Sequence, residues 1–287
     1  MDRIAAVTGA RGFIGSRLCD FLRERGYRVV ELRRDVGTDR ADARRFSLEA
    51  PVDPAILRGV DLLVHTAYDP RPVSWEAIRR VNLEGSLALF DAAAEADVRR
   101  VVHLSTMSSF EGCRSMYGRV KLEIERDALR RGFGVLRPGL VHGPAAGGMV
   151  GSLERMVGLA PLLPMVGRGG QRLYLIHVED LCRLIERVAT LGEAPAAPLI
   201  AAHEQSWPFA RILKTLARSR GRRVWLCPVP WRLVWAPLAA LEALGIRIGF
   251  RADSVVSLVN QDPDPDFSAT RELGIELREF GAETTDR

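Results

Sequence analysis

The stretch Thr8-Gly9-Ala10-Arg11-Gly12-Phe13-Ile14-Gly15 decides the fold. It follows an apolar run at residues 4–7 and precedes an amphipathic segment at 16–25, so it predicts a strand, a tight glycine turn and a helix. Glycine is needed where the backbone turns sharply or approaches a ligand closely. The N-terminus of the following helix presents free N–H groups and a partial positive charge, which suit a pyrophosphate. The stretch therefore predicts a dinucleotide-binding turn, with a plain structural turn as the alternative.

The composition is that of a globular protein. The chain has 287 residues, 47% of them hydrophobic and 27% charged, which suits one large domain or a domain with a smaller lobe. No apolar leader precedes the first strand, and the longest apolar region, 225–250, contains three prolines and three charged residues. We therefore expect no membrane span and a cytoplasmic protein, with an interfacial helix as the alternative.

The cysteines and the cationic residues bear on three questions: metal binding, nucleic-acid binding and the role of the lysines. The four cysteines lack metal-ligand spacing, so we expect free thiols in a reducing compartment and no metal site. The net charge of +5 comes from arginines spread along the chain without a basic block, so we expect no nucleic-acid partner. Of 41 basic residues only Lys121 and Lys214 are lysines, so a lysine here marks a place that a planar arginine fork does not suit.

Apolar runs alternate with helical patterns through the first half of the chain. The expected strands are 4–7, 28–32, 44–48, 61–65, 101–104 and 134–136, and the expected helices are 16–25, 75–97 and 116–131. This alternation predicts an α/β fold, a Rossmann-type doubly wound parallel sheet with a smaller C-terminal substrate lobe. We assign residues 1–142 to the dinucleotide-binding domain, with 171–190 returning to it, and 143–287 mainly to the lobe.

The lobe shows weaker patterns. We expect loops at 144–148 and 161–170, helices at 181–190 and 209–218, strands at 199–202 and 224–227, and prolines 228, 230 and 237 breaking up the apolar run behind them.

Ligands of such sheets bind at the carboxyl ends of the strands. Arg33 and Arg34 follow the second strand, where an acid would accept from a ribose hydroxyl and an arginine suits a 2′-phosphate. Arg11 in the glycine turn could reach the same phosphate. We therefore expect NADP(H) to be favoured over NAD(H), although the arginines are also compatible with a plain surface.

A hydroxyl cluster at 105–109 follows the fifth strand, and Tyr117 and Lys121 come shortly after it. Residues four apart on a helix share a face, and a nearby ammonium lowers the pKa of a tyrosine. At these residues the chain resembles the extended short-chain dehydrogenase/reductase family, the NAD(P)-dependent epimerase/dehydratase group. Residues 8–15 match its TGxxGxxG, and 81–85, 136–144, 176–181 and 267–274 resemble its later motifs.

The resemblance implies a mechanism in which Tyr117 is the acid/base and Lys121 binds the nicotinamide ribose. Thr106 would hydrogen-bond the substrate oxygen, with Ser105 and Ser108 as alternative hydroxyls. The implied cofactor contacts are Gly9, Arg11, Gly12, Phe13, Ile14, Gly15, Arg33, Arg34, Ala67, Asn82, Lys121 and Pro138. The implied substrate contacts are Tyr68, Ser108, His142 and Arg172.

The family's sugar dehydratases carry Thr-Asp-Glu at the active hydroxyl, whereas this chain has Thr106-Met107-Ser108. Without those acids, water elimination has no evident catalyst. We therefore expect an NAD(P)-dependent oxidoreductase or epimerase acting on a secondary alcohol or ketone of a sugar or nucleotide-sugar, with a homodimer allowed. The alternatives are a reductase or dehydrogenase of an apolar non-sugar alcohol, which the apolar C-terminal run favours, and a cofactor-binding subunit without turnover.

Overall fold

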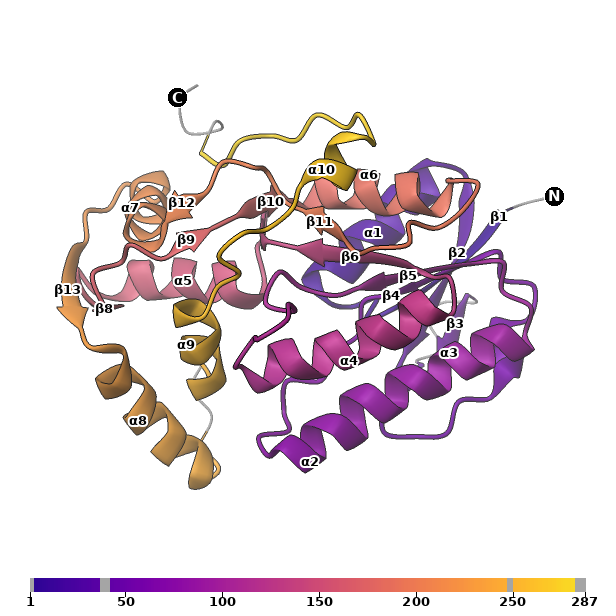
Figure 1. The fold of residues 1–287 in the computed structure, drawn as a ribbon, viewed down its shortest axis with the longest axis horizontal. Helices are drawn as coiled ribbons and strands as arrows, with labels where there is room; N and C mark the ends of the chain where they lie inside the picture. Colours follow the sequence, from indigo (N-terminus) through magenta and orange to yellow (C-terminus); the bar gives the residue numbers. More distant parts are fainter. Residues whose placement is uncertain (1–2, 37–41, 247–249, 282–287) are drawn as a thin grey trace.

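The computed structural model describes residues 3–36, 42–246 and 250–281. Among these residues the main sheet has seven strands in the order β11-β6-β5-β4-β1-β2-β3, and every neighbouring pair is parallel (Figure 1). The strands are β1 (Arg3–Thr8), β2 (Tyr27–Arg33), β3 (Ala43–Arg45), β4 (Leu62–His65), β5 (Arg100–Leu104), β6 (Gly134–Pro138) and β11 (Leu199–Ala201). The predicted doubly wound parallel sheet is confirmed.

Helices cover both faces of this sheet because its strands are apolar on both sides. In β4, Leu62 and Val64 join the core under α1 (Phe13–Glu24) and α6 (Val178–Ala189), whereas Leu63 joins the core under α3 (Gly85–Glu95) and α4 (Met116–Arg130). Successive strand residues point to opposite faces, so one short apolar run serves two cores.

The predicted helix 75–97 is divided in three. A short helix, α2 (Trp75–Ile78), leads into a π-helical turn (Arg79–Glu84) and then into α3. Asn82 lies in the turn, and its side-chain amide bonds the backbone of Asp69 in both directions, at 2.7 and 3.0 Å. Such wide turns occur often at functional sites. Here the turn fixes the loop that follows β4.

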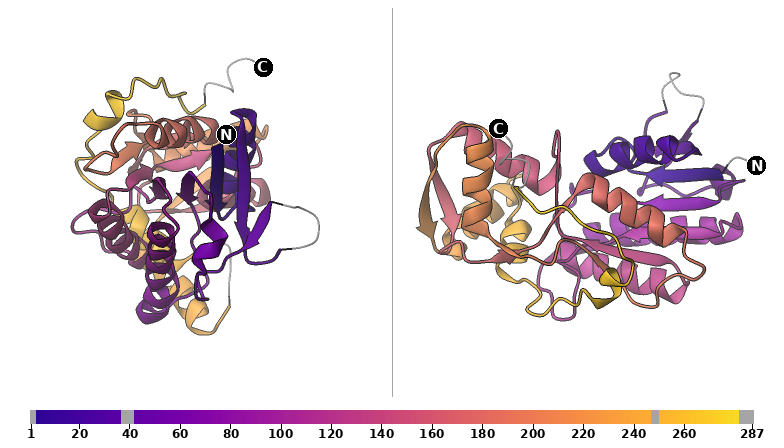
Figure 2. Two further views of the ribbon diagram at one scale, coloured as in Figure 1. Left: turned by 90° about the vertical axis from the view of Figure 1, so that its right-hand side faces the viewer. Right: turned by 90° about the horizontal axis from the view of Figure 1, so that it is seen from above.

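The smaller lobe lies beyond the carboxyl ends of the strands, where Figure 2 shows its orange elements beside the indigo and purple sheet. It contains two-stranded sheets and packed helices around a separate core. The remaining elements are a short 3₁₀ helix (Pro54–Leu57), β7 (Leu140–His142), α5 (Gly148–Leu159), β8 (Leu162–Val166), β9 (Arg172–Leu173), β10 (Leu175–His177), β12 (Trp207–Pro208), α7 (Phe209–Ser219), β13 (Trp225–Val229), α8 (Trp231–Ala243), α9 (Ala252–Val259) and α10 (Ser268–Arg271).

Two predictions for the lobe were wrong. The predicted loop 161–170 contains β8, which pairs with the distant β13. The prolines after β13 do not prevent a helix: α8 begins directly after Pro230 and continues through Pro237. Proline suits a helix start, and the carbonyl that loses its donor at Pro237 lies on the exposed side of α8, where water can bond it. The chain also returns to the main sheet after residue 190, because β11 pairs with β6. The domain boundaries remain a prediction.

A buried hydrogen-bond network joins the ends of β1 and β4. Thr8 Oγ1 accepts the backbone N–H groups of Thr66 and Ala67, at 3.0 and 3.1 Å, and lies 2.8 Å from His65 Nδ1. In return, Thr66 Oγ1 donates to the Thr8 carbonyl, at 2.6 Å. The Thr8 side chain therefore fixes the spacing between the glycine turn and the segment after β4.

The proton positions in this network follow from its far end. The Ser86 hydroxyl donates to the Asn82 carbonyl, at 2.6 Å, so it can only accept from His65 Nε2, which lies 2.9 Å away. His65 Nδ1 is then the unprotonated nitrogen and accepts from the Thr8 hydroxyl. Burial lowers the pKa of His65 to about 3, so the imidazole is neutral, as this arrangement requires.

Replacing Thr8 with Val keeps the shape of the side chain and removes its oxygen. Two backbone N–H groups and His65 Nδ1 then lose a buried partner, so the free energy of unfolding should fall by about 2–4 kcal/mol in urea denaturation. The control is Thr190→Val, which removes one exposed bond to the Arg187 carbonyl and should cost less than about 1 kcal/mol. Equal losses in the two variants would contradict the network.

Candidate active site

A cleft of about 1340 Å³ opens at the carboxyl ends of β1, β2, β4 and β5 and extends under the lobe. Most of the site residues predicted from the sequence line this cleft. Those that line it are Gly9, Arg11, Gly12, Phe13, Ile14, Gly15, Arg33, Arg34, Ala67, Tyr68, Ser105, Thr106, Ser108, Tyr117, Lys121 and Pro138.

The glycine turn fits a close approach of backbone to ligand. Gly9 has a φ of +67°, and a Cβ there would lie 2.8 Å from Thr66 Oγ1. A Cβ on Gly15 would lie 2.2 Å from the Gly9 carbonyl oxygen, so only glycine lets α1 start this close to the turn. The first turn of α1 contains no acid, and its cap, Gly12, has no side chain. Its N–H groups are therefore available to an anion in the cleft.

The end of β2 is electropositive on the cleft side. The one acid in β2, Glu31, is buried and bonded by Arg23, at 2.5 Å, and by Arg33. Glu31 is absent from the described lining of the cleft, whereas Arg33 and the exposed Arg34 belong to it. Arg23 and Arg33 thus form ion pairs with the one carboxylate of β2 that could accept a hydrogen bond from a ribose hydroxyl.

Helix α4 is fixed at its start by the residue that precedes it and by a residue of the C-terminal lobe. Ser115 caps it locally, because its hydroxyl accepts the Gly118 N–H at 3.0 Å. Asp253 of α9 adds a second cap: its two carboxylate oxygens accept the N–H groups of Met116 and Tyr117, at 2.8 and 2.9 Å. A negative charge is favourable at a helix N-terminus. The lobe therefore positions the backbone of Tyr117.

The Tyr117 phenol lies beside Thr106. Burial raises the pKa of Tyr117, and a hydrogen bond with the Thr106 side chain opposes part of that rise. Thr106 Oγ1 also accepts the Ser108 N–H, at 3.2 Å, which holds its orientation. Ser108 Oγ instead accepts from Ser257 of α9, at 2.9 Å, and Ser105 Oγ has no hydrogen-bond partner among the described residues. Of the three hydroxyls, Thr106 is the one that the structure places against Tyr117.

Lys121, four residues after Tyr117 on α4, lines the same cleft. Its Nζ donates to the Leu104 carbonyl at 2.7 Å and lies 5.5 Å from the centre of the Tyr68 ring, which packs edge-on against Tyr117. Burial lowers the pKa of Lys121 to about 7, and the charge of Glu125 opposes part of this shift. The ammonium is therefore poised to lose or gain its proton near neutrality.

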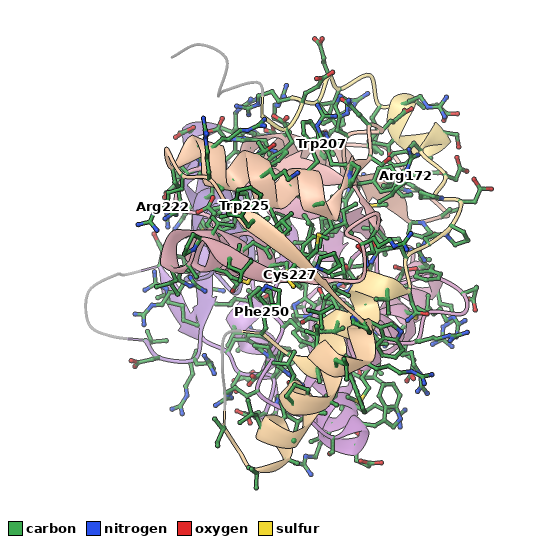
Figure 3. All side chains as sticks on the ribbon, turned by 90° about the vertical axis from the view of Figure 1, so that its left-hand side faces the viewer. Arg172, Trp207, Arg222, Trp225, Cys227 and Phe250 are labelled. Atoms are coloured by element: carbon green, nitrogen blue, oxygen red, sulfur yellow. The ribbon has the colours of Figure 1, made fainter. Side chains whose placement is uncertain are left out.

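Three predicted site residues do not line the cleft. Asn82 is buried behind the Asp69 loop, which it holds. His142 packs edge-on between His177 and Phe280, and burial lowers its pKa to about 4. Arg172 is exposed on β9, away from Phe250 of the cleft wall (Figure 3). Val141 and Leu173, the sequence neighbours of His142 and Arg172, line the cleft wall instead.

The lobe contributes an apolar wall. Its side chains include Met149, Leu153, Met156, Phe209, Val234, Leu238, Phe250 and Leu258. The one arginine that the lobe adds to the described lining, Arg251, is bonded to Glu242, at 3.0 Å, and to the carbonyls of Pro70 and Pro72. Sequence patterns gave no sign of Arg251, Asp253 or Ser257, because the loop after β4, the hydroxyl cluster after β5 and the start of α4, which they contact, lie more than a hundred residues away.

The glycine turn, the Tyr–Lys helix and the parallel sheet now lie in one cleft. A model of the NAD dependent epimerase/dehydratase family matches residues 5–200. The chain belongs to this family. The resemblance stated from the motifs is confirmed, and the family is one of enzymes.

Members of this family and solved structures of the same fold are similar over most of the chain. Ceramide reductase of Caulobacter vibrioides (strain NA1000 / CB15N) is 25% identical over 248 residues, which cover 79% of this chain and 74% of that protein. UDP-glucose 4-epimerase of Vibrio cholerae is 23% identical over 261 residues, 80% of each chain. The structure of MoeE5 in complex with UDP-glucose and NAD has a TM-score of 0.69 and 25% identity, covering 80% of this chain and 85% of that one.

The lowered pKa of Lys121 predicts a pH dependence of stability. Between pH 7 and 10.5 an unfolded lysine holds its proton and folded Lys121 does not, so the unfolded chain binds more protons and stability rises with pH. Lys121→Met should remove up to about 1.4 kcal/mol per pH unit from this slope. Urea midpoints of the cofactor-free protein at pH 7, 8 and 9 measure it.

The chain offers a matched control for that measurement. Lys214→Met removes the other lysine, which is exposed on α7, and should leave the slope unchanged. The same slope in wild type and Lys121→Met would show that Lys121 does not titrate in this range.

Proposed function

We propose that the protein is an NAD(P)-dependent oxidoreductase acting on a secondary alcohol or ketone, with Tyr117 as the acid/base. The observation that carries the proposal is the placement of the Tyr117 phenol beside Thr106 and near Lys121, in the cleft that the glycine turn also lines. The glycine cradle, the uncapped start of α1 and the two arginines after β2 fit a dinucleotide. When bound, this cofactor supplies or accepts the hydride.

The proton that the reaction adds to or removes from the substrate oxygen is transferred by Tyr117. In the reducing direction, the Tyr117 phenol donates its proton to the carbonyl oxygen as the adjacent carbon receives the hydride, which gives the alcohol and leaves a phenolate. In the oxidising direction the phenolate takes the hydroxyl proton. The Thr106 hydroxyl holds the same oxygen. Because burial raises the pKa of Tyr117, the free phenol keeps its proton near neutrality, and protonated Lys121 stabilises the phenolate that forms.

We propose NADP(H) as the preferred cofactor. Arg34 is exposed at the cleft rim, and Arg33 beside it is bonded to Glu31, so the end of β2 presents cations and its own acid is neutralised. A 2′-phosphate there would receive charge-assisted hydrogen bonds. Asp35, exposed at the same rim, is the remaining acid within reach of a ribose.

For the substrate, the cleft wall favours an apolar alcohol or ketone. A nucleotide-sugar carries a diphosphate that needs cations or free N–H groups, whereas the lobe lines the cleft mainly with aliphatic and aromatic side chains. The two charged residues that it adds to the described lining, Arg251 and Asp253, are already bonded within the protein. The similarity to ceramide reductase supports this class. A nucleotide-sugar is the second candidate, supported by the similarity to MoeE5, bound to UDP-glucose, and to UDP-glucose 4-epimerase.

The acid/base role predicts that Tyr117→Phe lowers turnover by about 10²-fold or more and leaves the dissociation constant of the cofactor nearly unchanged. Stopped-flow hydride transfer and fluorescence titration measure the two quantities. Tyr27→Phe, which removes a hydroxyl bonded to Arg3 at the opposite edge of the sheet, is the control and should retain activity. Full activity of Tyr117→Phe would remove the mechanism.

The cofactor proposal predicts tighter binding of NADPH than of NADH by the wild-type protein. Arg34→Ser should weaken NADPH by about 10- to 150-fold, the range for one charged hydrogen bond, with little effect on NADH. Arg99→Ser removes an equally exposed arginine, paired with Asp61 before β5, and should change neither affinity. If NADH binds more tightly to the wild type, the assignment is wrong.

The substrate proposal predicts turnover of aliphatic ketones with NADPH. Each added methylene that the apolar wall buries should raise kcat/KM about fourfold, until the cleft is filled. UDP-glucose and UDP-galactose are the comparison substrates, and epimerisation is recognised because it consumes no net cofactor. Turnover of the UDP-sugars together with inert ketones would favour the second candidate.

A further inference from the structure

Strand β13 and helix α8 carry large apolar side chains on their exposed side. Trp225 is 77% exposed and Leu233 66% exposed, and Trp231 and Trp235 are each more than a third exposed. None of the described residues of α8 is buried. Single exposed apolar residues are ordinary, but a continuous set of this size marks an interaction surface. We call it the β13–α8 face and define it as Arg222, Arg223, Trp225, Arg232 and Leu233.

The part of the chain that contains this face, residues 218–251, has a large excess of positive charge. Residues 218–251 contain seven arginines and a single acid, Glu242, so they carry +6 where the whole chain carries +5. Glu242 is bonded to Arg251 and to the Ala252 N–H, so it does not neutralise the exposed side. Arg222 and Arg223 are exposed and form no ion pair with any described residue. Figure 3 shows Arg222 beside Trp225, with α8 further along the same side of the molecule.

The two sides of α8 are both apolar, and they have different neighbours. Val234 and Leu238, four residues apart, face the cleft, where α9 lies between α8 and the catalytic helix α4 (Figure 1). Trp231 and Trp235 lie beside that stripe at i,i+3 and i,i+4 spacings and are 36% and 38% exposed, whereas Leu233, 66% exposed, faces outward. A helix in water normally presents a polar side to solvent. The outward side of α8 has one charged residue, Arg232, so it needs an apolar partner.

We propose that the β13–α8 face binds the surface of a phospholipid bilayer that contains anionic lipids. Tryptophan and leucine side chains would enter the boundary between headgroups and acyl chains, while Arg222 and Arg223 contact phosphates. No helix among the described residues is long and apolar enough to cross a bilayer, so α8 lies in the interface plane. The helix that rests on the lipid is also the wall of the cleft.

The charge distribution selects this occupant over a second copy of the chain. A two-fold dimer would place the same face on itself and bring its arginines together without acids to pair them. An anionic bilayer supplies the missing negative charge. The proposal concerns the free protein and does not depend on the reaction, so it can hold or fail separately from the proposed function.

The experiment is vesicle co-sedimentation of the full chain without cofactor or substrate. One set of vesicles is phosphatidylcholine alone, and the other contains about 30% phosphatidylglycerol. We expect binding to the anionic vesicles, a blue shift of tryptophan fluorescence, and weakening by salt. Arg222→Gln/Arg223→Gln should lower the partition constant at least about tenfold. Its matched control, Arg58→Gln/Arg80→Gln, removes the same charge from exposed positions on the Rossmann body and should bind as the wild type does.

The apolar contribution is tested by Trp225→Ser/Leu233→Ser, which changes the two most exposed apolar side chains of the face and should fold normally by circular dichroism. We expect it to lose both the binding and the fluorescence shift. The proposal is overturned if wild type does not bind the anionic vesicles, or if both double variants bind as well as wild type. A dimer that these variants dissociate, without vesicle binding, would also overturn it and identify a second copy as the occupant. Vesicle binding without turnover would leave this surface assigned and reject the proposed function alone.

Discussion

A neutral imidazole buried in the sheet holds the cofactor edge of the cleft together. His65 accepts from Thr8 through Nδ1 and donates to Ser86 through Nε2, so one ring joins β1, β4 and α3. A protonated ring could not accept from Thr8, and the Thr8 oxygen would lose the partner that orients it toward the backbone N–H groups after β4. Burial and the positive charge of Lys121 both lower the pKa of His65, so the lysine of α4 also helps to keep the network in this hydrogen-bonding form.

Positive charge is distributed unevenly over the molecule, and the net charge alone does not show this. At the end of β2, Arg23 and Arg33 neutralise Glu31, which leaves Arg34 to an incoming anion. The lobe wall of the cleft is mostly apolar among the described residues, and its charged members, Arg251 and Asp253, are bonded within the protein. Arg222, Arg223 and Arg232 of the same lobe are exposed. An apolar cavity next to a cationic apolar surface is an arrangement that a uniformly basic protein would not have.

Local patterns were enough to predict the sheet and the glycine turn, because the glycines and the apolar runs act on near neighbours in sequence. Non-local features escaped prediction. Strand β8 exists because of β13, and α8 tolerates Pro237 because that side of the helix is exposed. Asn82 was assigned to the cofactor, but the π-helical turn directs it to the Asp69 backbone. His142 and Arg172 follow family motifs in sequence, yet the packing of His142 against Phe280 and the outward course of β9 keep both from the cleft.

The cap that Asp253 places on α4 has a consequence for the order of biosynthesis. Met116 and Tyr117 leave the ribosome long before the residue whose carboxylate receives their N–H groups. The Rossmann body can collapse around its own two cores while the first turn of α4 still lacks this acceptor. A nascent chain that ends before residue 253 would therefore hold a folded glycine turn beside a helix α4 whose start still lacks its second cap.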